Sequence, residues 1–341
     1  MSERRAWLDV GPGEERGVVT LDGRPERLLI ERTGEARGPR VGARYLARVA
    51  EIAVGGRLAF LDLAGGETAV LPLKPQARIV RGALLDVEIA AEAHAEKAAT
   101  ARSAAPAAGR PGLIAAGPLL RQRLQAVAAD ATPITGAEAR EIADEAEAAA
   151  LATRHDLGGG LSLSIEATRA LVAVDVDWSP TGASSGKQAL DANLRALREA
   201  ARLLRLKSLG GSVVIDLAGF PRDIAAILAE AKAAFVPDQP GVAVLPVSRL
   251  GLLQIGLPRR ERPVGERLLD ADGRLSARSV AQRLARAAER EGRADPGGRV
   301  FAACAPAVAA EARSLIAELG PRYCLVEELG WDRLKTDISN R

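Results

Sequence analysis

The sequence of 341 residues has very few of the residues that most often build metal centres and catalytic triads. Its two cysteines, Cys304 and Cys324, form no CxxC pair, and its two histidines, His94 and His155, have no HExxH spacing. These counts argue against a structural zinc cluster, a His-ligated metal site and a Ser-His-Asp triad. Any catalysis must therefore depend on carboxylates, lysines, arginines or hydroxyl groups.

Long apolar runs are also lacking. No window reaches the ~18 uninterrupted apolar residues of a membrane-spanning helix, and the N-terminus has no apolar signal-peptide core. We therefore expect a soluble, cytoplasmic protein without a membrane partner. Aromatic residues make up only 3% of the chain, but 48% of all residues are hydrophobic, enough for a globular protein of two or three domains. The formal charge of +3 permits a nucleic-acid partner without requiring one.

Short strands are expected in the first hundred residues. Residues 1–40 predict strands joined by turns, with "GVVTLDG" and "RLLIERT" around a turn at Gly23. Residues 41–100 predict a small β-barrel, because apolar and polar residues alternate between glycine pairs at 55–56 and 65–66. The stretch "GALLDVEIAAEA" would supply a closing strand.

A linker and two helices are expected next. Residues 98–112 are rich in Ala, Pro and Gly, which indicates a linker or a shortened loop. Residues 119–130 and 136–152 predict helices. The second has Thr135 as its expected N-cap, with Glu138 three residues later in a capping-box pattern.

The second half of the chain predicts a βαβ unit and a further small domain. Residues 161–178 predict a hairpin whose second strand contains "ALVAVDVDW". An amphipathic helix at 186–211, ending at Gly210-Gly211, and a buried strand at 212–220 follow it. From residue 276, a helix, a strand, a helix and a last strand "YCLVEEL" predict a separate α/β domain.

Acidic residues stand at the ends of both strands of this unit: Asp175 and Asp177 on the first, Asp216 on the second. Such strands end at one edge of a sheet, where open α/β sheets bind ligands, and residues i and i+2 share a strand face. We therefore expect three carboxylates to converge. Such a group favours a magnesium ion, which keeps positions open for phosphate oxygens. The alternative is that the acids cap turns or pair with neighbouring arginines.

Four stretches resemble motifs of the ribonuclease E/G family. They are "ALVAVDVDWS", "DANLRALREAARLLRLKSLGG", "SVVIDLAGF" and "SRLGLLQI". The corresponding family motifs are A-hydrophobic-x-I-D-I/V-N-S, T-N-L-E-A-A with R-Q-L-R-L-R-D-L-G-G, I-V-I-D-F-I-D-M, and S-R-F-G-L-L-E. Order and spacing agree over residues 158–257. A weaker resemblance extends to the family's OB-fold barrel, through "LAFLDLAGGETAVLPLK", and to its small C-terminal domain over residues 276–326.

The resemblance implies a role for six residues. They are Asp175 and Asp216 as the catalytic magnesium ligands, Asp177 at a position that orients the first of them, Phe60 as a barrel aromatic that stacks on a base, Lys97 near the scissile phosphate, and Arg249 as a phosphate contact. A stacking aromatic suits single-stranded RNA with little sequence preference. From the residues alone, Phe60 could equally be barrel core, and Lys97 and Arg249 solvated surface charges.

The sequence also departs from the family pattern. Asp177 replaces an Asn, Gly219 stands at the second acid of I-D-F-I-D-M, and Val70 replaces a second barrel aromatic. Ala115 and Ala116 fall where the family's 5′-monophosphate sensor has Arg and Thr. The CPxCxGxG zinc linker is missing too, so we expect no zinc and no zinc-tied tetramer. The resemblance leaves a homodimer formed through the C-terminal domain as the expected assembly.

We therefore expect a multidomain α/β fold, in which an OB-fold barrel is inserted beside an α/β catalytic domain and a small C-terminal α/β domain follows. The expected division is residues 1–40 as N-terminal strands packing on the catalytic domain, 41–100 as the RNA-binding barrel, 101–135 as a shortened sensor and linker region, 136–270 as the catalytic domain, and 271–341 as the C-terminal domain.

The function that the resemblance implies is a magnesium-dependent endoribonuclease of bacterial type. It would bind one Mg²⁺ per active site, cleave single-stranded RNA to 5′-phosphate and 3′-hydroxyl ends, and act in RNA processing or decay. The alternative is an RNA-binding protein of the same fold with little or no nuclease activity. A third reading, in which the acids only cap turns, is a scaffold without a role in RNA.

Overall fold

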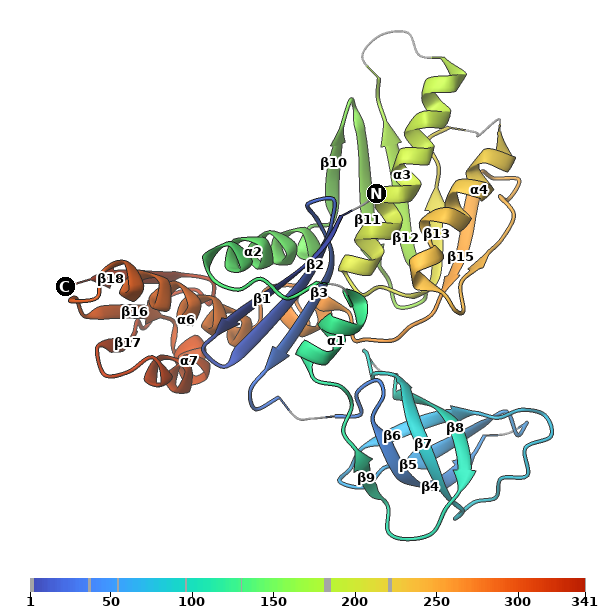
Figure 1. Ribbon diagram of the computed structural model, residues 1–341, viewed down its shortest axis with the longest axis horizontal. Helices are drawn as coiled ribbons and strands as arrows, with labels where there is room; N and C mark the ends of the chain where they lie inside the picture. Colours follow the sequence, from blue (N-terminus) through green and yellow to red (C-terminus); the bar gives the residue numbers. More distant parts are fainter. Residues whose placement is uncertain are drawn as a thin grey trace.

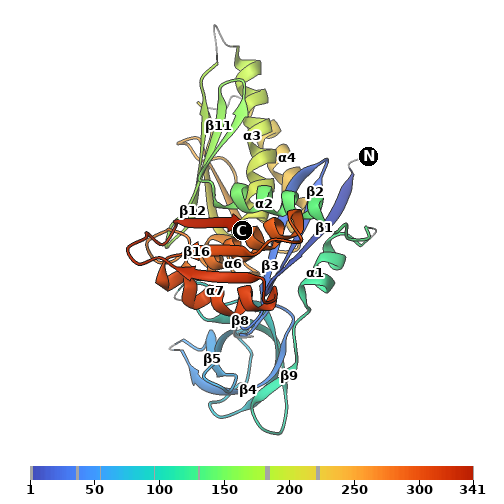
Figure 2. The ribbon, with the colours of Figure 1, turned by 90° about the vertical axis from the view of Figure 1, so that its left-hand side faces the viewer.

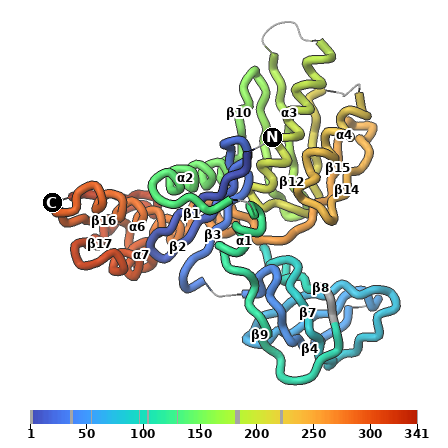
Figure 3. Tube along the Cα trace, in the orientation of Figure 1, coloured from blue at the N-terminus to red at the C-terminus, as the bar shows by residue number. Residues whose placement is uncertain are grey.

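The structure is a computed structural model that describes residues 3–35, 38–53, 55–95, 97–129, 131–180, 185–219 and 223–340. It is a mixed α/β protein with a barrel and three further sheets (Figure 1). Figure 3 shows that the chain passes from the N-terminal sheet into the barrel and returns to the body, where the remaining elements follow. The helices of these described ranges include none that is both long and apolar enough to cross a membrane.

The first sheet is an antiparallel meander of β1 (Arg4–Gly11), β2 (Glu14–Leu21) and β3 (Arg24–Arg32), as expected for residues 1–40. Asp22 and Gly23 both have positive φ, which suits the two-residue hairpin between β2 and β3. One face packs on α1 (Leu120–Val127) through residues such as Leu29. The other face joins the large core around α2 (Ala137–Leu151). Because both faces are buried, apolar residues occupy consecutive positions in these strands.

The barrel consists of β4 (Arg44–Ile52), β5 (Leu58–Asp62), β6 (Thr68–Pro72), β7 (Leu84–Ala91) and β8 (Ala99–Pro106). Their order is β5-β6-β8-β7-β4, and pairing of β4 with β5 closes the ring. β9 (Gly112–Ala115) adds to β4 on the outside. This closed barrel is consistent with the expected OB-fold.

The expected linker at 98–112 is wrong, because residues 99–106 form strand β8 of the barrel. This strand pairs with β6 in parallel and with β7 antiparallel. Its inward positions are Ala99 and Ala101, both fully buried. Small inward residues give a strand little apolar periodicity, so the composition looked like that of a linker. The strands of the barrel and its extension run to residue 115, beyond the expected boundary at 100.

The second large sheet has the order β10-β11-β12-β13-β15-β14. Its strands are β10 (Arg154–Gly158), β11 (Leu161–Ala167), β12 (Val172–Trp178), β13 (Gly211–Asp216), β14 (Ala243–Val244) and β15 (Leu252–Leu257). The antiparallel pair β11–β12 confirms the hairpin, and the parallel pair β12–β13, joined by α3 (Gly186–Leu206), confirms the βαβ unit. Helix α4 (Ile224–Ala234) and the 3₁₀ turn η1 (Val236–Asp238) follow β13.

Two helix ends differ from the sequence prediction. Helix α2 has Gly136 as its N-cap and no side-chain cap, so Thr135 does not cap it. Helix α3 ends at Leu206 with Lys207 as its C-cap, and Ser208 takes the left-handed conformation that was expected of the following glycines. Gly210 serves close packing instead, because a Cβ there would lie 2.8 Å from the backbone oxygen of Pro258, whereas Gly211 does have a positive φ, of +95°.

The C-terminal domain follows α5 (Val264–Leu268) and contains α6 (Ala277–Ala294), β16 (Val300–Cys304), α7 (Pro306–Glu318) and β17 (Tyr323–Glu327). The predicted helix, strand, helix and strand are thereby confirmed. The sequence analysis missed one element, β18 (Thr336–Asn340), which pairs antiparallel with β16. Its sequence "TDISN" offers one partly buried apolar residue, Ile338, which is too weak a pattern to predict a strand.

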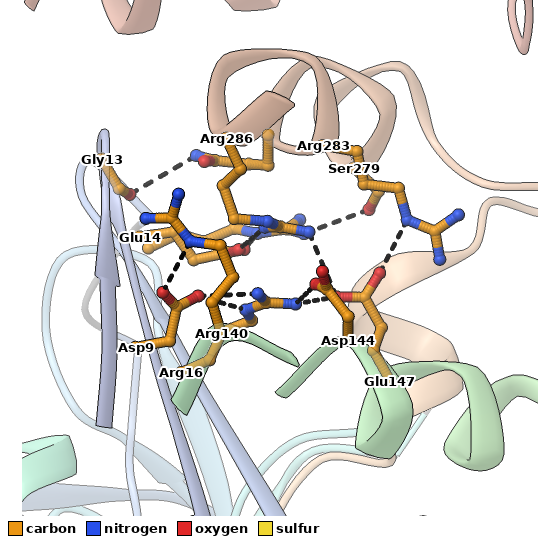
Figure 4. Close-up of polar contacts among 12 residues, drawn as sticks. Asp9, Gly13, Glu14, Arg16, Arg140, Asp144, Glu147, Ser279, Arg283 and Arg286 are labelled. Atoms are coloured by element: carbon orange, nitrogen blue, oxygen red, sulfur yellow. Dashed lines mark hydrogen bonds and ion pairs between the residues drawn. The ribbon is translucent and has the colours of Figure 1, made fainter. Parts of the chain in front are cut away.

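Buried ion pairs join α6 to the N-terminal sheet and α2 (Figure 4). The side chain of Arg16 on β2 is fully buried, with Nη2 2.6 Å from Asp9 Oδ2 and Nη1 3.0 Å from Glu147 Oε2 on α2. Arg286 on α6 pairs with Glu14 and lies 3.4 Å from Glu147 Oε2. Burial alone would raise the pKa of the Glu147 carboxyl, but the neighbouring arginines outweigh it and hold that pKa below its ordinary value. The junction is therefore held by charge rather than by apolar packing alone.

The barrel is fixed to the body through Glu92, the residue after β7. Its backbone N–H donates to the carbonyl oxygen of Arg260 at 2.7 Å. Its carboxylate accepts from the backbone N–H of Arg262 at 3.0 Å and from Nη2 of Arg267 at 2.5 Å. The segment after β15 thus holds the exit of the barrel.

Candidate active site

Asp175 and Asp216 lie side by side on neighbouring parallel strands. They are direct register partners, so their side chains leave the same face of the sheet. Along β12, Val174 and Val176 are buried in the core that α3 covers, whereas Asp175 and Asp177 are exposed. Because side chains of a strand alternate between its two faces, the valines point toward the helices and the carboxylates lie on the open face. A strand with one buried face can therefore carry acids on the other.

The two acids line a small open notch of about 380 Å³ at the carboxyl ends of β12 and β13. Its walls are the loop from Leu217 to Gly219 and the side chain of Leu250. Leu250 lies close to the acids because Leu252, at the start of β15, is the register partner of Asp216. Three segments that are distant in the sequence thus meet at this sheet edge.

The pKa of Asp175 is raised by burial and by neighbouring negative charges. Burial raises the pKa of its carboxyl, and the nearby Asp177 and Asp216 raise it further, while Arg154 opposes them. A cation between Asp175 and Asp216 would relieve this repulsion. Magnesium accepts one or two protein carboxylates and keeps several waters, so the pair fits that ion by number and chemistry.

The expected convergence of three carboxylates is not found. Within the described ranges, no three acidic, His or Cys side chains are grouped closely enough to hold one metal ion. Asp177 instead has Oδ2 3.9 Å from Nη2 of Arg154, and the same Nη2 donates to Ser162 Oγ at 3.1 Å. Residues i and i+2 of a strand are roughly 7 Å apart, whereas adjacent strands are only about 4.8 Å apart. The close pair therefore forms across the ladder, between Asp175 and Asp216.

Asn193 is a residue of the site that sequence reasoning missed. It is buried on α3, where its Nδ2 donates to the carbonyl oxygen of Ala218 at 3.0 Å and its Oδ1 accepts from the Ala218 N–H at 2.9 Å. This double contact fixes the loop that follows Asp216. The available signal was an amide residue on the apolar face of a predicted amphipathic helix.

Arg249 lies at the tip of the turn beside the notch. It is exposed, and no ion pair or hydrogen bond of its side chain occurs among the described residues. Its neighbour Leu250 contributes to the wall of the notch. The structure thus places Arg249 within one residue of the wall, on the side of β15.

The two barrel candidates do not lie at the notch. Phe60 is 42% exposed on β5, opposite Val70 of β6, so it is not a core residue of the barrel. Lys97 is exposed between β7 and β8, where its backbone pairs with His94, whose Nδ1 is 3.7 Å from Glu266 on α5. Figures 1 and 2 show the barrel at one end of the molecule, with the carboxyl ends of β12 and β13 pointing away from it. The barrel strands are therefore separated from the carboxyl ends of β12 and β13.

Comparison with known proteins finds one family. Residues 119–261 match the model of the ribonuclease E/G family. Similar curated proteins are the chloroplastic ribonuclease E/G-like protein of Arabidopsis thaliana, 37% identical over 129 residues, and ribonuclease E of Haemophilus influenzae, 36% identical over 114 residues. These matches cover 36% and 32% of this chain and only 13% and 12% of the relatives. Ribonuclease E of Escherichia coli is 33% identical over 114 residues, 32% of this chain and 11% of that protein.

The matched range contains α1, α2 and the whole sheet that carries the notch. Asp175, Asp216 and Arg249 all lie within it, whereas the barrel and the C-terminal domain lie outside it. Residues 119–261 of this chain are therefore similar to the ribonuclease E/G family, the resemblance that the motifs of the sequence indicated.

Proposed function

We propose that this protein is a magnesium-dependent endoribonuclease that cleaves single-stranded RNA to 5′-phosphate and 3′-hydroxyl ends, in RNA processing or decay in the cytoplasm. The observation that carries the proposal is the direct register of Asp175 and Asp216 on parallel strands, at the edge of a notch within the family-matched range. The names of the curated relatives support an RNA substrate.

The proposed role of each site residue follows from its position around the notch. Asp175 and Asp216 hold the ion, and Asn193 holds the loop after Asp216 in place. When bound, magnesium supplies positive charge to the scissile phosphate and activates water. Arg249 contacts a phosphate oxygen beside the notch, where the planar guanidinium suits that group. Asp177 keeps Arg154 beside the ion site.

The barrel is proposed to be an OB-fold that binds RNA away from the notch. Phe60, exposed on β5, offers a stacking surface for an unpaired base, and Lys97 provides charge at the exit of the barrel. Selection of 5′-monophosphate ends should be weak, because exposed alanines stand at residues 115 and 116 where the family has Arg and Thr. The C-terminal domain is proposed to form a homodimer, for which analytical ultracentrifugation is the test.

A second candidate is an RNA-binding protein with little nuclease activity. The observation that favours it is the distance of the barrel from the acid pair, which separates binding from the place where cleavage would occur (Figure 1). The pairing of Asp177 with Arg154, where the family has an Asn, favours it as well.

The test compares cleavage of an AU-rich single strand by the wild type, by Asp216→Asn and by Asp191→Asn, with and without Mg²⁺. Asp191 is an exposed residue of α3 outside the notch and is a matched control. We expect Asp216→Asn to lose about 10²–10³-fold in rate, because part of the transition-state charge is no longer stabilised. Asp191→Asn should cleave as the wild type does.

RNA affinity measured in the same series separates the candidates. If the wild type and Asp216→Asn are equally inert while both bind RNA with a steep salt dependence, the RNA-binding protein is the correct reading. If neither binds RNA, the acids belong to a scaffold.

A further inference from the structure

The turn from Ser248 to Gly251 is held by its own hydrogen bonds. The Ser248 N–H donates to the carbonyl oxygen of Leu252 at 2.9 Å, and the Gly251 N–H donates to the carbonyl oxygen of Ser248 at 3.0 Å. Ser248 Oγ accepts from the N–H groups of Leu250 at 3.3 Å and Leu252 at 3.2 Å. Gly251 takes a φ of +83°, which closes the turn without strain. The two residues at the tip, Arg249 and Leu250, are therefore presented in a fixed position.

Leu250 is 82% exposed although it stands in this ordered turn. A leucine so placed gains hydrophobic free energy only when another molecule covers it. Leu252 is the register partner of Asp216, so Leu250 stands just beyond the carboxyl end of β13 and lines the notch with both acids. This leucine thus lies beside the space in which a reacting phosphate would sit.

The loop after Asp216 is also fixed, and its lining residues Leu217, Ala218 and Gly219 are the part of this wall that the structure describes. Asn193 clamps Ala218, and Gly219 has nothing within 4 Å of the position where a Cβ would stand. Among the described residues, the notch is therefore lined by two carboxylates, by the apolar Leu250 and by the small residues Ala218 and Gly219. Its volume, about 380 Å³, lies in the range of small-molecule sites.

We propose that Leu250 packs against the nucleobase next to the scissile phosphate, while Arg249 contacts the phosphate of the same nucleotide. The turn then determines which bond of a strand faces Asp175 and Asp216. Leucine offers no hydrogen-bonding group, so the contact accepts any base. It requires an unpaired nucleotide whose base can leave the stack, so the selection of unpaired RNA takes place at the notch itself as well as at the barrel. This inference rests on the proposed nuclease function.

The experiment compares Leu250→Ser with the control Leu245→Ser. Leu245 belongs to the same segment and is 47% exposed, but it does not line the notch. Substrates are one single-stranded RNA and its variants with one abasic nucleotide at each position around the cleaved bond. We expect Leu250→Ser to lower kcat/KM about 5- to 10-fold, the low end of base-stacking effects. One abasic position should cost the wild type a similar factor and cost Leu250→Ser nothing further. Leu250→Trp should restore the rate.

The outcomes are distinguishable from those of the proposed function. If Asp216→Asn is inactive while Leu250→Ser equals Leu245→Ser, the role of Leu250 is wrong and the nuclease remains. If the wild type itself does not cleave, the nuclease is wrong, and fluorescence of 2-aminopurine placed along a bound RNA then decides on Leu250. The fluorescence is compared between the single variant Asp216→Asn and the double variant Asp216→Asn/Leu250→Ser. A fluorescence change at one RNA position that the double variant loses supports the contact, and equal fluorescence in the two variants overturns it.

Discussion

At the scale of single residues, two buried nitrogen groups near the start of β10 and the end of α3 have unusual surroundings. The Lys207 ammonium donates to the carbonyl oxygens of Ala150 at 2.9 Å and Ala152 at 2.5 Å, and so closes the C-terminal end of α2. Burial lowers the pKa of Lys207 to about 8. His155 on β10 lies near this charge, and among the described residues its buried Nε2 has no hydrogen-bond partner. A second positive charge is therefore unfavourable there.

His155 should make the protein sensitive to mild acid. Burial first, and then the charges of Lys207 and Arg202, lower its pKa from 6.5 to about 4. Between these two values the unfolded state binds more protons than the folded state, so stability falls as the pH is lowered from 6.5 to 4. After allowance for solvent screening, the loss should be about 1–2 kcal/mol.

Urea unfolding of the wild type and His155→Gln over that range is the measurement. The variant should lose less stability between neutral pH and pH 4 than the wild type, because Gln carries no titrating group. Equal losses in the two proteins would show that other groups cause the acid sensitivity.

At the scale of elements, the contact between α2 and α6 depends on Glu147, which is the shared partner of three arginines. Besides Arg16 and Arg286, its Oε1 accepts from Nε of Arg283 at 2.7 Å (Figure 4). Loss of this one carboxylate removes one of the acidic partners of the buried Arg16 and Arg286, which keep Asp9 and Glu14. A buried charge that loses its partner costs far more than a surface pair contributes.

Glu147→Gln should therefore destabilise the protein by about 1–3 kcal/mol, because charge-assisted hydrogen bonds are lost while other acids still compensate the arginines. Glu145→Gln, an exposed neighbour on the same helix, is the control and should change stability by less than about 0.5 kcal/mol. Chemical unfolding gives the free energies, and hydrogen exchange of the α6 amides reports whether the C-terminal domain loosens first. Equal stability of the two variants would mean that the network contributes nothing measurable.

Regular elements with strong patterns could be predicted from the sequence, whereas strands of small or polar residues could not. The helix at α3 and the strands at β12 and β13 have full apolar faces, and the acids at the ends of those strands lie where the topology requires. Strand β8 has only alanines toward the barrel, and β18 is mostly polar, so neither carries the period of a strand. Leu250 and Asn193 were missed because their roles arise from a turn and a loop brought together by the sheet.

At the scale of the whole molecule, the position of the barrel could not be predicted. It depends on contacts such as those of Glu92 with Arg262 and Arg267, between segments far apart in the chain. No local pattern encodes the distance that results between Phe60 and the acid pair. The expectation of a lysine close to the reacting phosphate came from the resemblance and stays a prediction, and the backbone of Lys97 pairs with that of His94, which lies beside Glu266 of α5.

Under the proposed function, this separation makes cleavage depend on the length of the RNA. A short oligonucleotide can occupy either the barrel or the notch, whereas a longer one that spans both gains the effective concentration of a tethered ligand. The second-order rate constant for cleavage should therefore rise by about 10-fold or more once a series of single-stranded RNAs passes the spanning length. Phe60→Ala should flatten that rise, and a rate independent of length in the wild type would contradict it. Small fragments left by earlier cuts would then escape further cleavage, so that the shape of the enzyme itself would set the size at which degradation stops.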